Sequence, residues 1–225
     1  MNKGTDDNQI EGWQHLHSPE YLESCTWRIK NIYLTWVEQF LDILEEFDLA
    51  DKRVNDIGCN LLQFYKGMRK RKLLLQYYGY DIEEQYLDLA KGFFPEVEGR
   101  IQKVNIVKKQ PQMADFSVVS AILEHLPSLS PGLENILRST REVILLRTFL
   151  GEKAITQKAF AKGAREKYWV NQYSFEEILN LFSEHGFESV VLRDRFTDSM
   201  PKLVLRDLVR TQYVVRGIRI KKENG

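Results

Sequence analysis

Short apolar runs alternate with amphipathic stretches along the middle of the chain, and this alternation constrains the fold more than any other feature. The apolar runs predict strands at residues 53–58, 73–82, 100–107, 115–123 and 142–149. Helical periods predict helices at residues 61–72, 83–94 and 131–141. Because parallel strands must be joined by crossover connections, the pattern indicates an α/β, doubly wound fold with helices on both faces of a parallel sheet.

A helix and two strands are expected after this alternation. Ser174 suits the N-cap of the helix, Glu177 completes a capping box, and Gly186 suits the left-handed position at its end. Residues 188–192 and 211–221 predict the two last strands, with a long polar linker between them.

The first 50 residues have a different pattern. Residues 1–17 are a polar, acidic leader, and Ser18 and Pro19 then suit the N-cap and the first position of a helix. Apolar residues recur at helical spacing as far as Leu44, which predicts one long or two consecutive amphipathic helices. We expect a leader and helical extension over residues 1–50 and one sheet domain over residues 51–225.

Composition excludes several classes of protein. The chain of 225 residues is 43% hydrophobic and 28% charged, so disorder, collagen and coiled coil are excluded as its main organisation. Its 32 basic and 32 acidic residues cancel, which disfavours nucleic-acid binding driven by net charge. The longest apolar run, residues 118–123, is too short to cross a bilayer, and the N-terminus lacks a signal-peptide core. We expect a cytoplasmic protein with no membrane partner; its oligomeric state stays open.

The loop after the first predicted strand has the composition of a nucleotide-binding loop. In open parallel sheets, ligands bind at the carboxyl ends of the strands, and here residues 56–60 read DIGCN. Gly58 permits a sharp turn close to a ligand. The fingerprint GxGxxG is incomplete because Asn60 and Gln63 replace its later glycines, and the chain has no GxxxxGK[ST] loop. NAD, FAD and ATP are therefore disfavoured, and an ordinary glycine turn remains an alternative.

An acidic residue follows at the end of the second predicted strand. Asp81 lies 23 positions after Gly58. A carboxylate at this point can accept hydrogen bonds from both hydroxyls of a ribose. Taken alone, an acidic residue at the end of a strand is usually a solvated turn residue, but together with the glycine loop Asp81 favours a nucleoside site.

Four segments in this order resemble the class I S-adenosylmethionine-dependent methyltransferases: DIGCN, GYDI, DFSVVSAILEHLP and YSFEEILNLFSEHGF. The resemblance covers roughly residues 50–220. It implies S-adenosylmethionine as the cofactor and a Rossmann-like, mostly parallel seven-stranded sheet. The antiparallel seventh strand would be residues 211–221, beside residues 188–192.

The resemblance also implies the residues on the methionine and ribose side of the cofactor. Asp56 and Gly58 would lie under the methionine part, with Cys59 and Asn60 in the same loop, and Asp81 would hold the ribose. The family loop commonly reads GxG, and Asn60 occupies the second glycine position. Asparagine tolerates left-handed backbone better than most residues, so binding can survive this departure.

On the adenine side, the resemblance implies that Ile82 packs on the ring. Asn105 would reach the adenine amino group, with Ile106 beside it. Ser120 and Ala121 would line the floor between the cofactor and the acceptor.

His125 is the candidate general base. Methyl transfer is an in-line displacement that needs positioning and water exclusion, and a hydroxyl acceptor also needs a base nearby. His125 follows the fourth predicted strand, and histidine is the residue type that most often acts as a general base, although a structural or cofactor-contacting role is an alternative. Glu124-His125 also resembles metal-dependent RNA 3′-end methyltransferases, but Ala121 replaces a further acid of that motif. We therefore expect no metal.

The acceptor is expected to be bound by parts outside the sheet. Tyr21, Tyr168 and Trp169 are the candidates, because aromatic rings with basic neighbours can stack on a ring and pair with an anion. The predicted function is methyl transfer from S-adenosylmethionine to an oxygen or nitrogen of a small-molecule acceptor. The alternatives are a non-catalytic partner protein of the same fold, and an RNA methyltransferase supported only by the basic cluster at residues 66–72.

Overall fold

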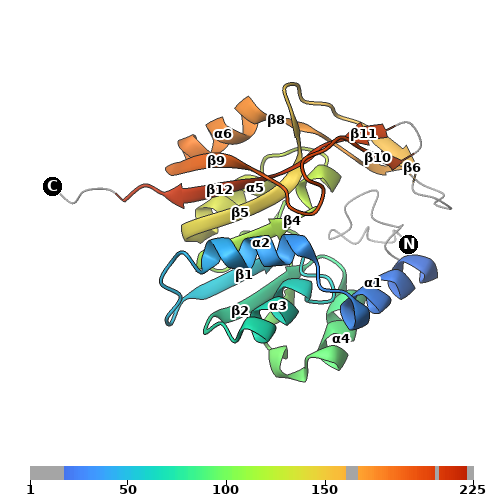
Figure 1. Ribbon diagram of the computed structural model, residues 1–225, viewed down its shortest axis with the longest axis vertical. Helices are drawn as coiled ribbons and strands as arrows, with labels where there is room; N and C mark the ends of the chain where they lie inside the picture. Colours follow the sequence, from blue (N-terminus) through green and yellow to red (C-terminus); the bar gives the residue numbers. More distant parts are fainter. Residues whose placement is uncertain (1–17, 161–166, 206–207, 222–225) are drawn as a thin grey trace, which may run out of the picture.

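The computed structural model describes residues 18–160, 167–205 and 208–221. At its centre is a sheet in the order β3-β2-β1-β4-β5-β12-β9 (Figure 1). The strands of this path are β1 (Arg53–Ile57), β2 (Gln76–Asp81), β3 (Ile101–Lys103), β4 (Ala114–Ser120), β5 (Thr140–Gly151), β9 (Phe187–Arg193) and β12 (Gln212–Arg219). Strands β1 to β5 run parallel, and β12 lies antiparallel between β5 and β9. The predicted doubly wound α/β sheet is confirmed, and the short strand β8 (Tyr173–Ser174) extends it beside β5.

Helices cover both faces of the sheet. They are α1 (Pro19–Asn31), α2 (Thr35–Leu44), α3 (Gln63–Arg71), α4 (Glu84–Phe93), α5 (Gly132–Ser139) and α6 (Phe175–Glu184), with 3-10 turns at Pro95–Val97 and Leu123–His125. Apolar side chains of α2 and α3 pack with Val118 of β4, whereas those of α5 and α6 pack with its neighbour Val119. Successive strand residues point to opposite faces, so each central strand is buried on both sides.

The expected start and stop signals operate as the sequence predicts. Ser18 Oγ accepts a hydrogen bond from the backbone N of Tyr21 at 3.1 Å, and Ser174 Oγ accepts one from Glu177 N at 3.0 Å. Each bond satisfies a backbone donor that the first helical turn leaves unpaired. Gly186, just after α6, takes a left-handed φ of 75°.

The N-terminal extension forms two helices separated by residues 32–34. Lys66 of α3 donates through Nζ to the carbonyl oxygens of Ile29 at 2.6 Å and Ile32 at 3.1 Å, which ties the end of α1 to the sheet domain. The predicted leader, residues 1–17, lies outside the described residues.

The prediction of a long polar linker between the two last strands is wrong. This segment contains a hairpin of β10 (Lys202–Leu205) and β11 (Leu208–Arg210), and a second hairpin of β6 (Lys158–Phe160) and β7 (Lys167–Trp169) follows β5. Their strands are too short to show alternation in the sequence. They are held by a small separate core in which Phe149, Tyr168, Val170 and Leu208 are buried together.

The parts outside the sheet gather at one end of it. Figure 1 shows α1, β6 and the β10–β11 hairpin at the end opposite the point where β12 ends. Gln212, where β12 begins, pairs with Phe149 near the end of β5, so these hairpins lie at the carboxyl edge of the parallel strands. Within the three described segments, no helix has the length and apolar character needed to span a membrane.

Candidate functional site

A cavity of about 460 Å³ opens at the carboxyl edge of the sheet. It is lined by the loops after β1, β2, β3 and β4, by α1, and by Arg147 of β5. The sequence-predicted residues that it brings together are Tyr21, Asp56, Gly58, Cys59, Asn60, Asp81, Ile82, Asn105, Ile106, Ser120, Ala121 and His125. Tyr168 and Trp169 do not line it.

The loop after β1 requires glycine at its first turn. Gly58 has a φ of 72°, and a Cβ there would lie 2.1 Å from Cδ1 of Ile122. Asn60 also takes a left-handed φ of 46°, and its Oδ1 accepts a hydrogen bond from Leu61 N at 2.8 Å. A short polar side chain thus stabilises a backbone conformation that most residues avoid. The loop keeps its left-handed turn with asparagine in the second glycine position.

Asp81 connects the ends of β1 and β2. Its Oδ2 accepts a hydrogen bond from Asn60 N at 2.8 Å, and its Oδ1 accepts one from Glu83 N at 3.0 Å. Burial raises the pKa of Asp81 to about 6, while these backbone donors act in the opposite direction. The carboxyl group is therefore held in place and still lines the cavity.

Asp56 is a second buried carboxyl group in the same cavity. Its Oδ2 accepts a hydrogen bond from the hydroxyl of Tyr77 at 2.8 Å. Burial, together with the charge of Asp81, raises the pKa of Asp56 to about 7 against the lowering effect of Tyr77. Among the described residues, neither Asp56 nor Asp81 forms an ion pair. Two acidic groups without a cation make this part of the cavity receptive to a positively charged ligand.

Asn105 and Ile106 lie at the adjoining wall. Asn105 Oδ1 accepts a hydrogen bond from Val107 N at 3.0 Å, which fixes the turn after β3. The carbonyl oxygen of Ile106 accepts one from Asn135 Nδ2 at 2.8 Å. Both residues line the cavity from this anchored turn.

His125 is positioned by the two aromatic residues that do not line the cavity. Its Nδ1 is 2.8 Å from the carbonyl oxygen of Trp169, and its ring packs against Tyr168 with centroids 5.4 Å apart. A carbonyl oxygen only accepts, so Nδ1 carries the hydrogen and Nε2 is the basic nitrogen of the neutral ring. The ring of Trp169 makes a cation–π contact with Lys158, whose Nζ lies 4.4 Å from the ring centroid.

The cavity wall also contains residues that the sequence did not single out as site residues, among them Arg28, Arg147 and Phe196. Arg28 of α1 lies 3.0 Å from Cys25 Sγ and over the ring of Tyr21. One sequence feature could have indicated Arg147 as a site residue: it is the one charged residue inside the apolar run VILLRTF. No sequence feature indicated Phe196, because it falls in the segment that was expected to be a linker.

Within the described part of the chain, no three His, Cys, Asp or Glu side chains are grouped as a metal site would require. Glu124, next to His125, instead accepts a hydrogen bond from Thr148 Oγ1 at 2.8 Å through Oε2.

No protein-family model matches the chain, and no curated protein matches it in sequence. Solved structures match it in fold. Magnesium protoporphyrin IX methyltransferase from Synechocystis, with bound S-adenosylmethionine, is 14% identical, with a TM-score of 0.62 over 98% of this chain and 100% of that one. A TehB-like S-adenosylmethionine-dependent methyltransferase from Corynebacterium glutamicum is 16% identical, with a TM-score of 0.61 over 92% and 100%. The chain thus has the Rossmann-like fold of the class I S-adenosylmethionine-dependent methyltransferases.

Proposed function

We propose that the cavity binds S-adenosylmethionine and that the protein transfers its methyl group to an oxygen or nitrogen of a small-molecule acceptor. The observation that carries this proposal is the pair of buried carboxyl groups, Asp56 and Asp81, beside the tight turn at Gly58. A cavity of about 460 Å³ is in the range used for ligands of this size.

The charges of the site suit this cofactor. S-adenosylmethionine has a sulfonium and an ammonium group against one carboxylate, and it supplies an electrophilic methyl group to a nucleophile. Asp56 would face the methionine part and Asp81 the ribose hydroxyls. Gln63 Oε1 is buried in the same wall without a hydrogen-bond donor among the described residues, so it can accept from an ammonium group.

Other residues would enclose the remaining parts of the cofactor. Ile82 and Ile106 would pack on the adenine, and Asn105 would meet its amino group. The backbone of Cys59 and Asn60 would approach the methionine part closely. Ser120 and Ala121 would form the floor toward the acceptor.

His125 would act as the general base for a hydroxyl acceptor. The carbonyl of Trp169 sets its tautomer and orientation, which leaves Nε2 as the nitrogen able to take a proton. Tyr168 and Trp169 would then act through His125, and Tyr21 would contact the ligand from α1. Solved structures of the same fold include the pyocyanin biosynthetic protein PhzM, with a TM-score of 0.59 and 14% identity over 93% of this chain and 62% of that one. A small-molecule acceptor for this chain accords with the name of another of them, magnesium protoporphyrin IX methyltransferase.

Calorimetric titration with S-adenosylmethionine and S-adenosylhomocysteine, with NAD as the control ligand, tests the cofactor. We expect micromolar affinity, about −8 kcal/mol, for the first two only. Asp81→Ala should weaken binding more than about tenfold, because hydrogen bonds to a charged acceptor contribute roughly 1.5–3 kcal/mol. The matched control is Asp88→Ala, which removes an exposed aspartate of α4 that pairs with Lys91. Absence of binding to the unaltered protein would refute the proposal.

His125→Ala separates chemistry from binding. With an accepted hydroxyl substrate, turnover should fall about 10²- to 10⁴-fold while the affinity for S-adenosylhomocysteine stays within about twofold. Turnover equal to that of the unaltered protein would assign His125 a structural role.

A further inference from the structure

Arg147 places a buried guanidinium group at the wall of the cavity. It lies near the carboxyl end of β5 and is only 4% exposed. Its backbone carbonyl oxygen accepts a hydrogen bond from Ala121 N at 2.9 Å, so it sits beside the end of β4. A charged side chain is rarely buried so deeply unless it is paired.

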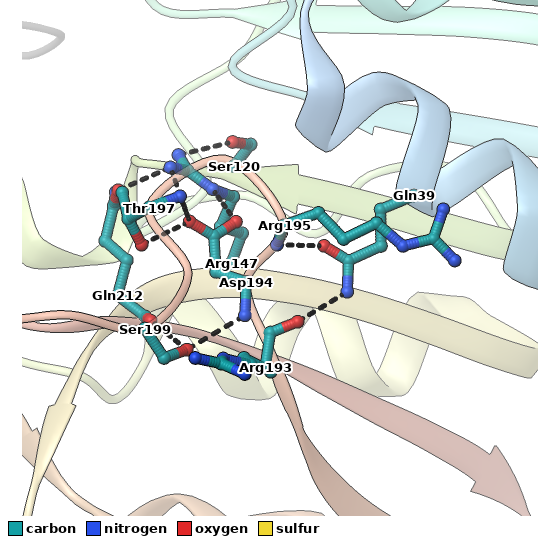
Figure 2. Close-up of polar contacts among 9 residues, drawn as sticks. All are labelled: Gln39, Ser120, Arg147, Arg193, Asp194, Arg195, Thr197, Ser199 and Gln212. Carbon is teal, nitrogen blue, oxygen red and sulfur yellow. Dashed lines mark hydrogen bonds and ion pairs between the residues drawn. The ribbon is translucent and has the colours of Figure 1, made fainter.

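Asp194, in the loop after β9, pairs with one side of this guanidinium. Arg147 donates through Nε to Asp194 Oδ1 at 2.8 Å and through Nη2 to Oδ2 at 3.2 Å, and Nη2 also donates to Gln212 Oε1 (Figure 2). Asp194 Oδ2 accepts two more hydrogen bonds, from Thr197 N at 2.9 Å and Thr197 Oγ1 at 2.6 Å. Burial raises the pKa of Asp194, but Arg147 and Thr197 outweigh it and hold the pKa below its usual value. The carboxylate is fully occupied by donors and does not line the cavity.

The loop that carries Asp194 is itself anchored at several points. Asp194 N donates to Ser199 Oγ at 2.9 Å, and Ser199 Oγ donates to the carbonyl oxygen of Gln212 at 2.8 Å. Gln39 of α2 donates to Arg193 O at 2.7 Å and accepts from Arg195 N at 2.9 Å (Figure 2). The guanidinium of Arg147 is therefore oriented by a rigid frame.

The other side of the guanidinium is left for the cavity. Among the described residues, Nη1 makes one hydrogen bond, to Ser120 Oγ at 3.5 Å, which is the outer limit of such a bond. Nη1 has two N–H donors, and the hydroxyl of Ser120 is a further donor beside it. Phe196, half-exposed, forms an apolar wall here, with its ring centroid 5.4 Å from Cζ of Arg147.

This end of the cavity is distinct from the end with the acidic residues. Asp81 is on β2 and Arg147 on β5, with β1 and β4 between them. Three strand spacings of about 4.8 Å separate them by roughly 14 Å along the sheet edge. The end of the cavity at Asp81 is acidic, whereas the end at Arg147 offers the N–H donors of a guanidinium group.

We propose that Arg147 Nη1 and Ser120 Oγ bind a carboxylate group of the methyl acceptor, an inference that rests on the proposed function. Two neighbouring donor groups match the two oxygens of a carboxylate, and charge-assisted bonds of this kind are short and directional. Asp194 already balances the charge of Arg147, so a monoanion fits this end better than a phosphate dianion does. Phe196 supplies apolar contact for the carbon skeleton that carries the carboxylate.

The test uses a panel of aliphatic and aromatic monocarboxylates, each paired with its primary amide. Affinity is measured by calorimetry with the unaltered protein saturated with S-adenosylhomocysteine, at constant ionic strength. We expect the best carboxylates to bind about tenfold or more tightly than their amides, and a phosphomonoester arm to bind more weakly than the carboxylates. Equal affinity for acids and amides, or binding of neither, would overturn the proposal.

Variants assign the effect to the two donors. Arg147→Lys keeps a cation beside Asp194 but loses the planar fork, so the preference for acids should fall below about threefold. Ser120→Ala leaves the Arg147–Asp194 pair intact and should reduce the preference severalfold. Arg195→Gln is the matched control, because Arg195 lies in the same loop, pairs with Asp42 on the surface and does not line the cavity.

The cofactor readout keeps the two proposals apart. Affinity for S-adenosylhomocysteine should stay within about twofold in Arg147→Lys. A parallel loss of that affinity would assign Arg147 to the cofactor's own carboxylate and overturn the acceptor assignment. If the unaltered protein does not bind S-adenosylhomocysteine, the proposed function fails. The affinities for acids and amides, measured in the absence of S-adenosylhomocysteine, then test only whether Arg147 and Ser120 bind a carboxylate.

Discussion

The two halves of the cavity are built in different ways. In the β1–β2 half, Gly58, Asn60 and Asp81 lie within 24 residues of one another, and the carboxylate of Asp81 accepts a hydrogen bond from the backbone N of Asn60. In the β5 half, Arg147 depends on Asp194, which is 47 positions away in the chain. The first half is a property of two strand-end loops, and the second exists only when β5 and the loop after β9 have come together.

This difference predicts that the β5 half depends more strongly on a single long-range contact. Asp194→Ala leaves the guanidinium of Arg147 buried without its partner, and breaking a buried ion pair in this way destabilises a protein by about 3–5 kcal/mol. Urea denaturation measures the change. Arg138→Ala, which removes an exposed pair with Glu134, should change the free energy of unfolding by no more than about 1 kcal/mol. A loss below about 1 kcal/mol in Asp194→Ala would mean that the ion pair does not organise this half.

The β1–β2 half should instead fail through its backbone. Gly58→Ala places a Cβ against Ile122 in a left-handed conformation, and strain and overpacking together lower the free energy of unfolding by about 2–4 kcal/mol. Affinity for S-adenosylhomocysteine should fall more than tenfold because the turn that approaches the ligand is displaced. Gly92→Ala in α4 is the matched control: no atom lies within 4 Å of its Cβ position, so stability should stay equal or rise. Similar behaviour of the two variants would contradict the role given to the turn.

The same contrast explains what the sequence predicts well. The doubly wound α/β class follows from apolar runs and crossover rules, and most of the cavity residues that were expected lie at or just after strand ends, where position along the chain determines position in space. Arg147 and Phe196 were missed because their neighbours come from distant segments. The hairpins β6–β7 and β10–β11 were missed because strands of three or four residues show no periodicity and are stabilised by the small core around Tyr168 and Leu208.

The affinity of the β1–β2 half for its ligand should depend on pH. Asp56, with a pKa of about 7, and Asp81, with a pKa of about 6, must be ionised to favour a cationic ligand. Affinity for S-adenosylmethionine should therefore rise about tenfold between pH 6 and pH 8, with release of protons on binding. Calorimetry in buffers of different ionisation enthalpy measures both. Asp56→Asn should bind more weakly and lose most of the pH dependence, and an affinity independent of pH in the unaltered protein would refute this account.

The sign of the stability change follows from the same raised pKa values. Below pH 3.8, the ordinary value for aspartate, the native and unfolded chains are both protonated and the two carboxyl groups do not destabilise the fold. Between that pH and about 7 the native state holds its protons longer, so the free energy of unfolding without ligand falls as the pH rises through this window. Asp56→Asn should flatten this decline in urea denaturation measured from pH 5 to pH 8.

The smallest effect is expected at Asn60, where the chain departs from the family pattern. Asn60→Gly keeps the left-handed φ but removes the hydrogen bond from Leu61 N to Oδ1. Glycine also gives the unfolded chain more conformational freedom. The free energy of unfolding should therefore fall by about 0.4–1 kcal/mol. Affinity for S-adenosylhomocysteine should stay within about twofold, because Asp81 accepts from the backbone N of residue 60 and not from its side chain. Asn60→Val is the contrasting variant, since a β-branched residue at positive φ should weaken binding. A large gain in affinity on Asn60→Gly would show that the asparagine side chain obstructs the ligand, and the β1–β2 half would then not be preformed for binding.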